Sequence, residues 1–144
     1  MGDGRIELER ELKSSGSRQF DLLFLDAFSS DSIPVHLLTS ECFDLYLEHL
    51  HEKGIIIAHI TNKFVDLKPV LASLANSKGL ASVHIEHDND EFEIVTDWVL
   101  LSRDVNTFTD AAFDAEQKSW TQGLKEIIWT DDSSSVFEIV NWNN

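Results

Sequence analysis

The segment FDLLFLDAFSSDSIPVHLLTSECFDLYLEHL (residues 20–50) decides the fold of this 144-residue chain. Its first six residues are apolar except for Asp21, and Asp26 closes the run. Such a run is typical of a strand that is buried on both faces, as strands of parallel sheets are. Thr39 then offers an N-cap, and apolar residues at near-helical spacing predict a helix that ends at Gly54. The segment therefore predicts a buried strand, a loop and a helix, in that order.

Strands and helices continue to alternate on both sides of this segment. Residues 54–60 (GIIIAHI) predict a second buried strand, and residues 67–75 predict a helix. Residues 80–87 and 97–102 predict an antiparallel hairpin at the end of the sheet. Before the first strand, residues 5–13 predict a short amphipathic helix, with Asp3 as its candidate N-cap. The order indicates the α/β class: a Rossmann-like doubly wound sheet in a single domain, residues 1–144.

Composition narrows the classes of partner and compartment. The chain has 11 Lys and Arg residues against 26 Asp and Glu residues, so its net charge is 11 − 26 = −15. This charge disfavours nucleic acid and membrane surfaces and favours cationic ligands such as polyamines, although it also serves plain solubility. Cys42 is the only cysteine, which excludes an intramolecular disulfide. The N-terminal residues lack the apolar stretch of a signal peptide, so the expected compartment is the cytoplasm.

The carboxyl end of the first strand is the first candidate site. In open parallel sheets, ligands bind outside the carboxyl ends of the strands. Asp26 lies at that point, and Ser29, Ser30 and Asp31 follow in the same loop. Two carboxylates in one loop can divide the work, one accepting a proton from an amine while the other orients it. The alternative is that Asp26 caps the exit turn and Asp31 caps a short turn before the proline.

Further candidates lie at the same edge and near the N-terminus. His59 ends the second predicted strand, and Asn62 follows in its loop, so both are candidate substrate contacts. Asp3 lies between two glycines, of which Gly4 lets a ligand approach the backbone, although such a turn is often only structural.

No metal site is predicted. On an alternating strand His84 and His87 point to opposite faces, which argues against shared coordination. His49 and His51 are expected on the surface near the C-terminal end of a helix, where a positive charge suits the helix dipole.

Three segments carry a family resemblance. They are GDGR (residues 2–5), residues 20–50 and GIIIAHITNKFVDLKPVLASLA (residues 54–75). Together they resemble the central and C-terminal part of the spermidine synthase-like proteins, which have the class-I S-adenosylmethionine methyltransferase fold. The resemblance continues more loosely through TDWVLLSRD (residues 96–104) and WTDD (residues 129–132). It implies that the chain forms the C-terminal half of that fold.

The resemblance also implies roles for individual residues. Asp3, with Gly4, would contact the adenine of S-adenosylmethionine or decarboxylated S-adenosylmethionine. Asp26 would accept the proton of the attacking amine, and Asp31 would help to hold that amine. The two acids are five residues apart here and closer together in typical spermidine synthases, a departure that bears on the choice of amine.

The glycine-rich turn and the ribose-binding acid of this fold do not precede residue 2. The sequence therefore predicts the C-terminal portion of a transferase that moves an aminopropyl or methyl group to an amine and that is incomplete on its own. The alternative is a non-catalytic module for assembly or polyamine binding, built on the same half-fold.

A final expectation concerns the strand at residues 20–25. Without the first half of the fold this strand becomes a sheet edge, and Asp21 is its only charge, whereas natural edges are usually blunted or covered. We expect a second copy of the chain to cover it in a two-fold dimer, or a missing half to pair with it. The alternative is that the N-terminal segment or the tail after Val105 folds back over the edge.

Overall fold

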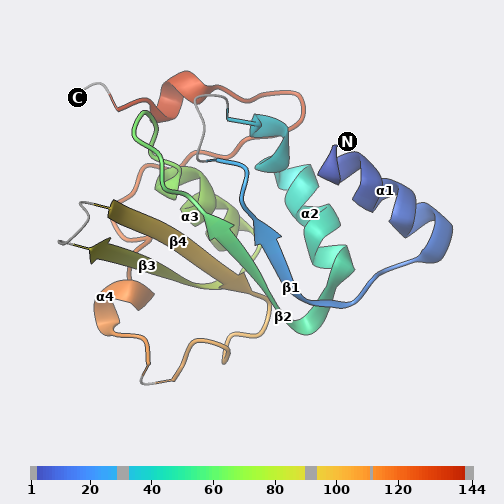
Figure 1. The fold of residues 1–144 in the computed structure, drawn as a ribbon, viewed down its shortest axis with the longest axis horizontal. Helices are drawn as coiled ribbons and strands as arrows, with labels where there is room; N and C mark the ends of the chain where they lie inside the picture. The colour runs from blue at the N-terminus through green and yellow to red at the C-terminus, as the bar shows by residue number, and fades with distance from the viewer. Residues whose placement is uncertain (1–2, 29–32, 90–93, 111, 142–144) are drawn as a thin grey trace.

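The computed structural model describes residues 3–28, 33–89, 94–110 and 112–141. Its helices and strands follow the predicted alternation (Figure 1). The predicted loop residues Ser29, Ser30 and Asp31 lie outside the described residues. The elements, in chain order, are α1 (Gly4–Ser15), β1 (Phe20–Leu25), η1 (Val35–Leu37), α2 (Ser40–His49), β2 (Leu50–His59), α3 (Lys68–Ser77), β3 (Ala81–Asn89), β4 (Ile94–Ser102), α4 (Ala115–Lys118) and η2 (Val136–Ile139).

The four strands form one open sheet in the order β1-β2-β4-β3. β1 and β2 run parallel, so their carboxyl ends meet at one edge, as the sequence predicts. β4 runs antiparallel to both β2 and β3, which confirms the predicted hairpin at the end of the sheet. Among the described residues β1 pairs only with β2, so it is an edge strand of this sheet.

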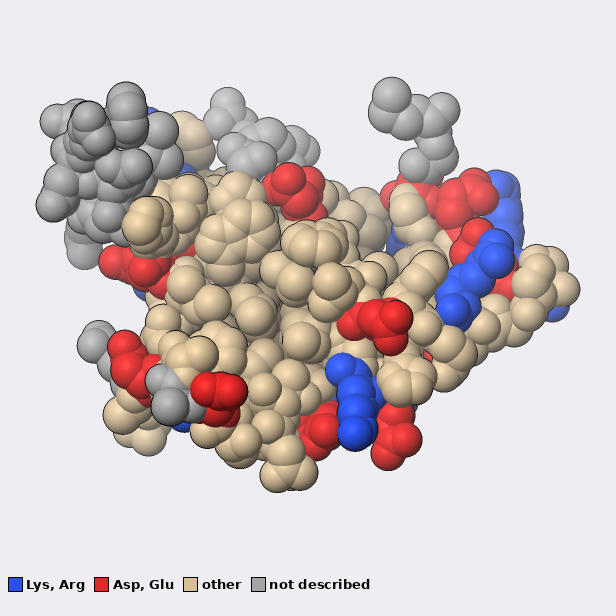
Figure 2. Space-filling view, turned by 60° about the horizontal axis from the view of Figure 1, so that its bottom comes forward, with Lys and Arg blue, Asp and Glu red and all other residues tan. Residues whose placement is uncertain are grey.

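The helices and the apolar core lie on one face of this sheet. Leu25, Ile56 and Val99 belong to one buried cluster with apolar residues of α2 and α3. On the opposite face of β1, the side chains of Leu22 and Phe24 are 52% and 61% exposed. The prediction that β1 is buried on both faces is therefore wrong for this chain. Figure 2 shows a side of the molecule whose centre carries few charged side chains.

The boundary between α2 and β2 differs from the prediction. α2 ends at His49 and β2 begins at Leu50, so Gly54 is not a helix cap but lies inside β2. A Cβ atom on Gly54 would lie 2.6 Å from both the Phe20 carbonyl oxygen and Leu50 Cγ. Glycine is therefore required where β2 passes close to the start of β1.

His49 is also placed differently, because it is fully buried rather than on the surface. Its Nδ1 accepts a hydrogen bond from the backbone N–H of Arg18 at 3.2 Å, and its Nε2 donates to the carbonyl oxygen of Leu8 at 2.9 Å. His49 thus ties the end of α2 to α1 and to the segment before β1. His51 is exposed, as expected, but it lies in β2. Within the described residues, no helix has the length and apolar character needed to cross a bilayer.

Candidate functional site

Asp26 and His59 meet at the carboxyl edge of the two parallel strands. Asp26 follows the last residue of β1, and His59 is the last residue of β2. His59 Nδ1 lies 2.9 Å from Asp26 Oδ1, which confirms that the two side chains share this edge. The side chain of Asp26 is 63% exposed, whereas that of His59 is 18% exposed. The pair therefore presents a carboxylate to solvent and holds an imidazole behind it.

The His59 ring is fixed by a second contact and leaves one nitrogen unsatisfied. It stacks on Trp98 of β4, with ring centroids 4.3 Å apart and planes 17° apart. An ionised carboxylate only accepts hydrogen bonds, so Nδ1 is the protonated nitrogen of His59 and donates the hydrogen bond to Asp26. Nε2 is buried and has no hydrogen-bond partner among the described residues. Leaving a buried polar atom unpaired costs about 1–3 kcal/mol, so Nε2 needs a partner that the described residues do not supply, such as a water molecule or a ligand.

Asn62 braces the loops that leave the two strands. Its Nδ2 donates to the carbonyl oxygen of Phe28 at 2.7 Å, and its Oδ1 accepts from the backbone N–H groups of Phe64 and Val65 at 2.8 and 3.1 Å. The Asn62 amide therefore joins the loop after β1 to the loop after β2. These contacts account for Asn62 as a structural residue, and its role in substrate binding stays a prediction.

A groove of about 390 Å³ between α1 and β1 places the predicted Gly4 beside Asp26. Apolar side chains such as Leu8, Leu23 and Phe28 line it, together with Arg5, Glu7, Glu11 and Asp26. Glu7 pairs with Arg10 and Glu11 pairs with Arg18, so among the described residues Asp26 is the lining carboxylate without a Lys or Arg partner. An apolar wall beside such a carboxylate suits an aliphatic amine, whose methylene groups and ammonium group need these two environments.

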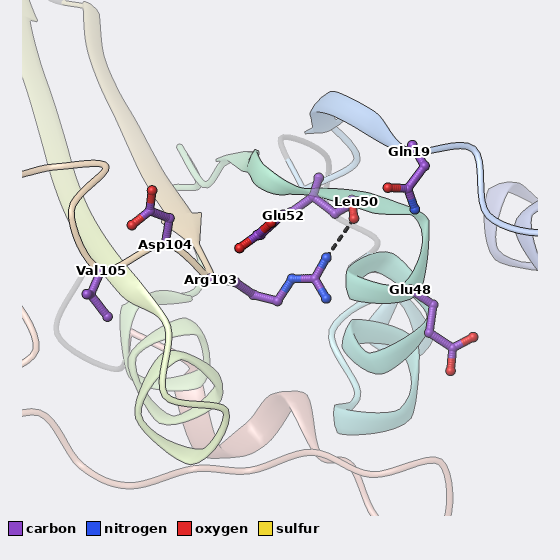
Figure 3. A pocket seen from close by; sticks show the side chains of 7 residues that line it. All are labelled: Gln19, Glu48, Leu50, Glu52, Arg103, Asp104 and Val105. Atoms are coloured by element: carbon purple, nitrogen blue, oxygen red, sulfur yellow. Dashed lines mark hydrogen bonds between the residues drawn. The ribbon is translucent and has the colours of Figure 1, made fainter.

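A larger hollow, of about 590 Å³, lies at the opposite end of the sheet (Figure 3). It is lined by Leu50 and Glu52 at the start of β2 and by Arg103 and Asp104 just after β4. The guanidinium of Arg103 donates to the carbonyl oxygen of Leu50 at 2.6 Å. Because its lining comes from the amino end of β2, this hollow is separate from the Asp26–His59 edge.

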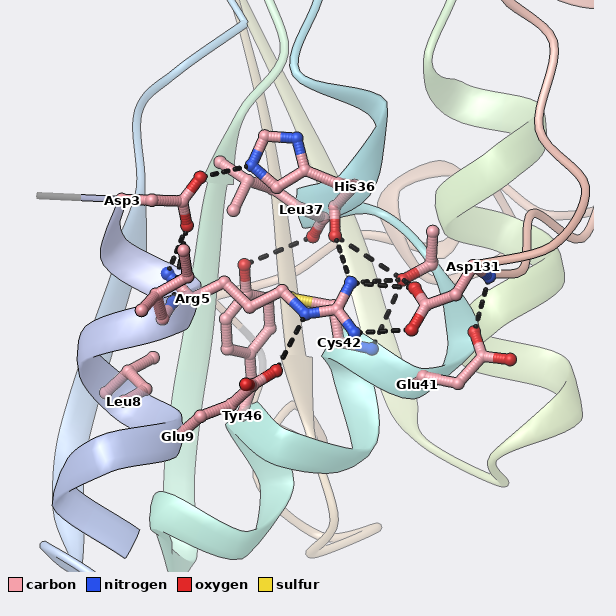
Figure 4. A network of polar contacts seen from close by, with 12 residues as sticks. Asp3, Arg5, Leu8, Glu9, His36, Leu37, Glu41, Cys42, Tyr46 and Asp131 are labelled. Carbon is pink, nitrogen blue, oxygen red and sulfur yellow. Dashed lines mark hydrogen bonds and ion pairs between the residues drawn. The ribbon is translucent and has the colours of Figure 1, made fainter.

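Asp3 holds the start of α1 in addition to any contact with a ligand. Its Oδ1 accepts from the backbone N–H groups of Arg5 and Ile6 at 2.9 and 3.3 Å, and its Oδ2 lies 2.7 Å from His36 Nε2 (Figure 4). Desolvation opposes its charge, but these hydrogen bonds outweigh that effect and lower the pKa of Asp3. The N-cap predicted at Asp3 is confirmed, and the contact with adenine stays a prediction.

The sequence did not predict the network that Arg5 forms beside Asp3. The guanidinium of Arg5 donates hydrogen bonds to both carboxylate oxygens of Asp131 and to the carbonyl oxygen of His36, the last at 3.0 Å (Figure 4). Thr39, the N-cap of α2, donates to Asp131 Oδ1 at 2.8 Å. The hydrogen bonds from Arg5 and Thr39 lower the pKa of Asp131 to about 2. α1, α2 and the C-terminal tail therefore meet at one carboxylate.

Replacing Asp131 with Asn is expected to destabilise the chain near pH 7, because it removes the ion pair with Arg5. The loss should be about 1 kcal/mol, since the Asp131 carboxylate is partly exposed. This corresponds to a fall of roughly 2–4 °C in melting temperature for a chain of this size. The pKa of Asp131 is lowered in the folded state, so its contribution is present above about pH 4 and is lost as the pH falls toward 2. Thermal melts between pH 2 and pH 7 measure this difference, with Asp132→Asn as the matched control. A constant difference over that pH range would contradict the assignment.

The comparisons with known proteins agree with this geometry at the level of fold. No protein-family model and no curated protein matches the chain. Among solved structures, it is similar to a probable spermidine synthase from Corynebacterium glutamicum, with 17% identity and a TM-score of 0.58. That match covers 94% of this chain and 54% of the other.

A second solved structure gives the same result. For spermidine synthase from Thermotoga maritima the identity is 17% and the TM-score 0.52, over 89% of this chain and 42% of the other. The chain thus spans about half the length of these two structures. The predicted fold class is confirmed: this is part of a spermidine synthase-like, class-I methyltransferase-like α/β fold.

Proposed function

We propose that this chain forms the amine-binding part of an aminopropyltransferase-like protein, with Asp26 as the proton acceptor. The observation that carries the proposal is the Asp26–His59 pair at the carboxyl edge of β1 and β2, with the orphaned His59 Nε2 behind it. The similarity in fold to two spermidine synthases supports the same class of reaction. Transfer of a methyl group at the Asp26–His59 pair is the alternative reaction to be tested alongside.

The chemistry asked of Asp26 is a single proton transfer. Asp26 accepts a proton from the cationic amine, which frees the lone pair of the nitrogen. That nitrogen then forms a bond to the aminopropyl carbon of the donor, the bond from that carbon to the sulfonium sulfur breaks, and the electron pair leaves with sulfur, so the product is a secondary ammonium. His59 holds Oδ1 of that carboxylate at 2.9 Å, which leaves Oδ2 to receive the proton. His59 is thus a positioning residue that fixes which oxygen faces the amine.

Electrostatics supports an amine as the acceptor. Asp26 lines the groove beside apolar side chains, and the chain carries a net charge of −15. Such a field attracts a cationic amine and raises its concentration near the site. A neutral or anionic acceptor would gain nothing from this arrangement.

The described residues provide only one side of a site for the nucleoside donor. Asp3 and Gly4 lie where the resemblance places the adenine contact, but Asp3 already accepts two backbone hydrogen bonds and pairs with His36. Each absent hydrogen bond to a charged group removes about 1.5–3 kcal/mol of binding free energy. We therefore propose that the donor is held mainly by another part of the assembled enzyme.

The chain by itself is expected to bind S-adenosylmethionine, or its decarboxylated form, with a dissociation constant weaker than about 0.1 mM. The reason is that the ribose and methionine supports are absent from its sequence. Titration calorimetry with the 144-residue chain measures this directly. A micromolar constant would show that other residues rebuild the pocket and would overturn the prediction.

A non-catalytic module that binds polyamines or mediates assembly is the second candidate. The coding sequence upstream of Met1 discriminates between the two. An in-frame strand, glycine-rich turn and helix would favour the transferase, and a stop codon would favour the module.

A further inference from the structure

His84, Glu86 and Asp97 gather their side chains on one face of the β3–β4 hairpin. Glu86 pairs directly with Asp97 across the two strands, and His84 lies two residues before Glu86 on the same face. One ligand atom from each residue lies within 4.8 Å of the other two. His84 Nε2 and Asp97 Oδ1 are the closest pair, at 2.9 Å. The hairpin therefore places one imidazole and two carboxylates around a common point.

The surroundings hold two of these residues in place. The backbone N–H of Asp97 donates to Thr61 Oγ1 at 2.8 Å. The His84 ring lies 6.0 Å from the ring of Trp120, whose Nε1 donates to Ser82 Oγ at 3.0 Å. The side chains of His84 and Asp97 are 15% and 21% exposed, so both are largely withdrawn from water. Outer contacts of this kind fix the orientation of metal ligands.

The two carboxylates of this cluster favour a bound cation. Like charges directly opposite each other in a sheet destabilise it, and Glu86 and Asp97 form such a pair. Lys68 lines the same cavity, of about 480 Å³, but within the described part of the chain it forms no ion pair with either carboxylate. A divalent ion bound by a neutral imidazole and two carboxylates gives a net charge of 2 − 2 = 0. His84 already pairs with Asp97, so Glu86 is the carboxylate of the cluster without a cationic partner among the described residues, and an ion would supply one.

We propose that His84, Glu86 and Asp97 bind a divalent transition-metal ion of the Zn²⁺ or Mn²⁺ class. One nitrogen and two carboxylate oxygens are ligands that suit these ions, with water completing the coordination. Ligand bonds of about 2.0–2.2 Å require only small side-chain rotations from the separations observed. The open cavity beside His84 and Glu86 gives the ion a path from solvent.

This site is independent of the proposed transfer reaction. Neighbouring residues of a strand point to opposite faces, so Asp97 and Trp98 do too, and Trp98 is the residue that stacks on His59. An ion at Asp97 would therefore lie across the sheet from the Asp26–His59 pair. The site is assigned to the stability and local order of the hairpin and not to the chemistry of Asp26.

Titration calorimetry of the EDTA-stripped chain with ZnCl₂, and separately with MnCl₂, tests the proposal. We expect one site with a dissociation constant below about 10 µM for at least one ion. Glu86→Gln and Asp97→Asn should each weaken that site at least about tenfold, because each removes a charged ligand. His87→Ala, on the same strand and the opposite face, should leave it unchanged.

Two results would overturn the proposal. The first is binding no tighter than about 1 mM for both ions. The second is equal affinity in Glu86→Gln and the unsubstituted chain, which would assign the heat to other surface histidines. Circular dichroism of each variant shows whether it is folded. The exposed Glu86 carboxylate forms no hydrogen bond or ion pair with another described residue, so Glu86→Gln keeps the test decisive if Asp97→Asn unfolds.

Discussion

Replacing Asp26 with Asn is expected to reduce aminopropyl transfer by about 10²–10⁴-fold, while binding of the nucleoside donor changes little. Asn has nearly the same shape as Asp but accepts no proton from the amine. His59 Nδ1 would still find an oxygen at the position of Asp26 Oδ1, so the local structure should persist. The loss therefore falls on the chemical step and appears in kcat rather than in KM for the donor.

The assay requires the longest natural reading frame that contains this chain, since the chain spans about half of the two similar structures. Asp21→Asn is the matched control, because it makes the same change at an exposed position of the same strand. His59→Gln should lower kcat less than Asp26→Asn and should change the pH profile, as expected for a positioning residue. Equal activity in Asp26→Asn and the unsubstituted protein would reduce Asp26 to a residue that ends a strand.

The second large effect is expected at the outer edge of β1. We propose that two copies of the chain associate through this strand, and that Phe24→Lys raises the dissociation constant of the dimer by about 10²–10⁴-fold. Burial of a Phe side chain contributes about 1.5–3 kcal/mol, and a two-fold interface contains two of them. Each 1.4 kcal/mol is about tenfold in affinity, which gives the stated range.

The structure supports an external partner for this edge. Phe24 is 61% exposed, and no strand of the described part of the chain pairs with the outer side of β1. The tail instead bridges Val140 to Val65, away from β1. Of the alternative covers, the described part of the tail runs away from β1, whereas α1 lies beside β1 across the groove, so the N-terminal segment stays an alternative to a second copy.

Sedimentation or light scattering over a range of concentrations measures the dimer. Phe137→Lys is the matched control, because Phe137 is a 77% exposed aromatic residue in η2. A monomer of 16.4 kDa at all concentrations, with slow exchange of the amides of residues 22–25, would contradict a second copy as partner. If the natural protein contains a preceding half, that half would take the place of the second copy.

Local signals in the sequence predicted most of the elements. The N-cap at Asp3, the apolar run of β1 and the alternation in β3 each depend on neighbouring residues, and the structure confirms all three. The shared edge of Asp26 and His59 was also predictable, because parallel strands place their carboxyl ends together.

Contacts between distant segments account for what the sequence did not reveal. In the sequence the helical spacing of apolar residues continues past His49. In the structure His49 is hydrogen-bonded to Leu8 of α1, and the next residue, Leu50, already pairs with Phe20 of β1. The ion pair between Arg5 and Asp131 joins residues 126 positions apart, and although both lie in segments that carry the family resemblance, no local pattern pairs them. The stacking of Trp98 on His59 follows from the register between β2 and β4, which composition cannot give.

A product assay tests most directly whether Asp26, at the carboxyl edge of β1 and β2, serves transfer to an amine. The longest natural protein containing this chain would be incubated with decarboxylated S-adenosylmethionine and a mixture of diamines and polyamines, and the products would be identified by mass spectrometry. A parallel reaction would contain S-adenosylmethionine as a possible methyl donor. We expect an amine extended by one aminopropyl group, formed by the unsubstituted protein and absent with Asp26→Asn. Consumption of neither donor, or equal product from Asp26→Asn, would contradict it.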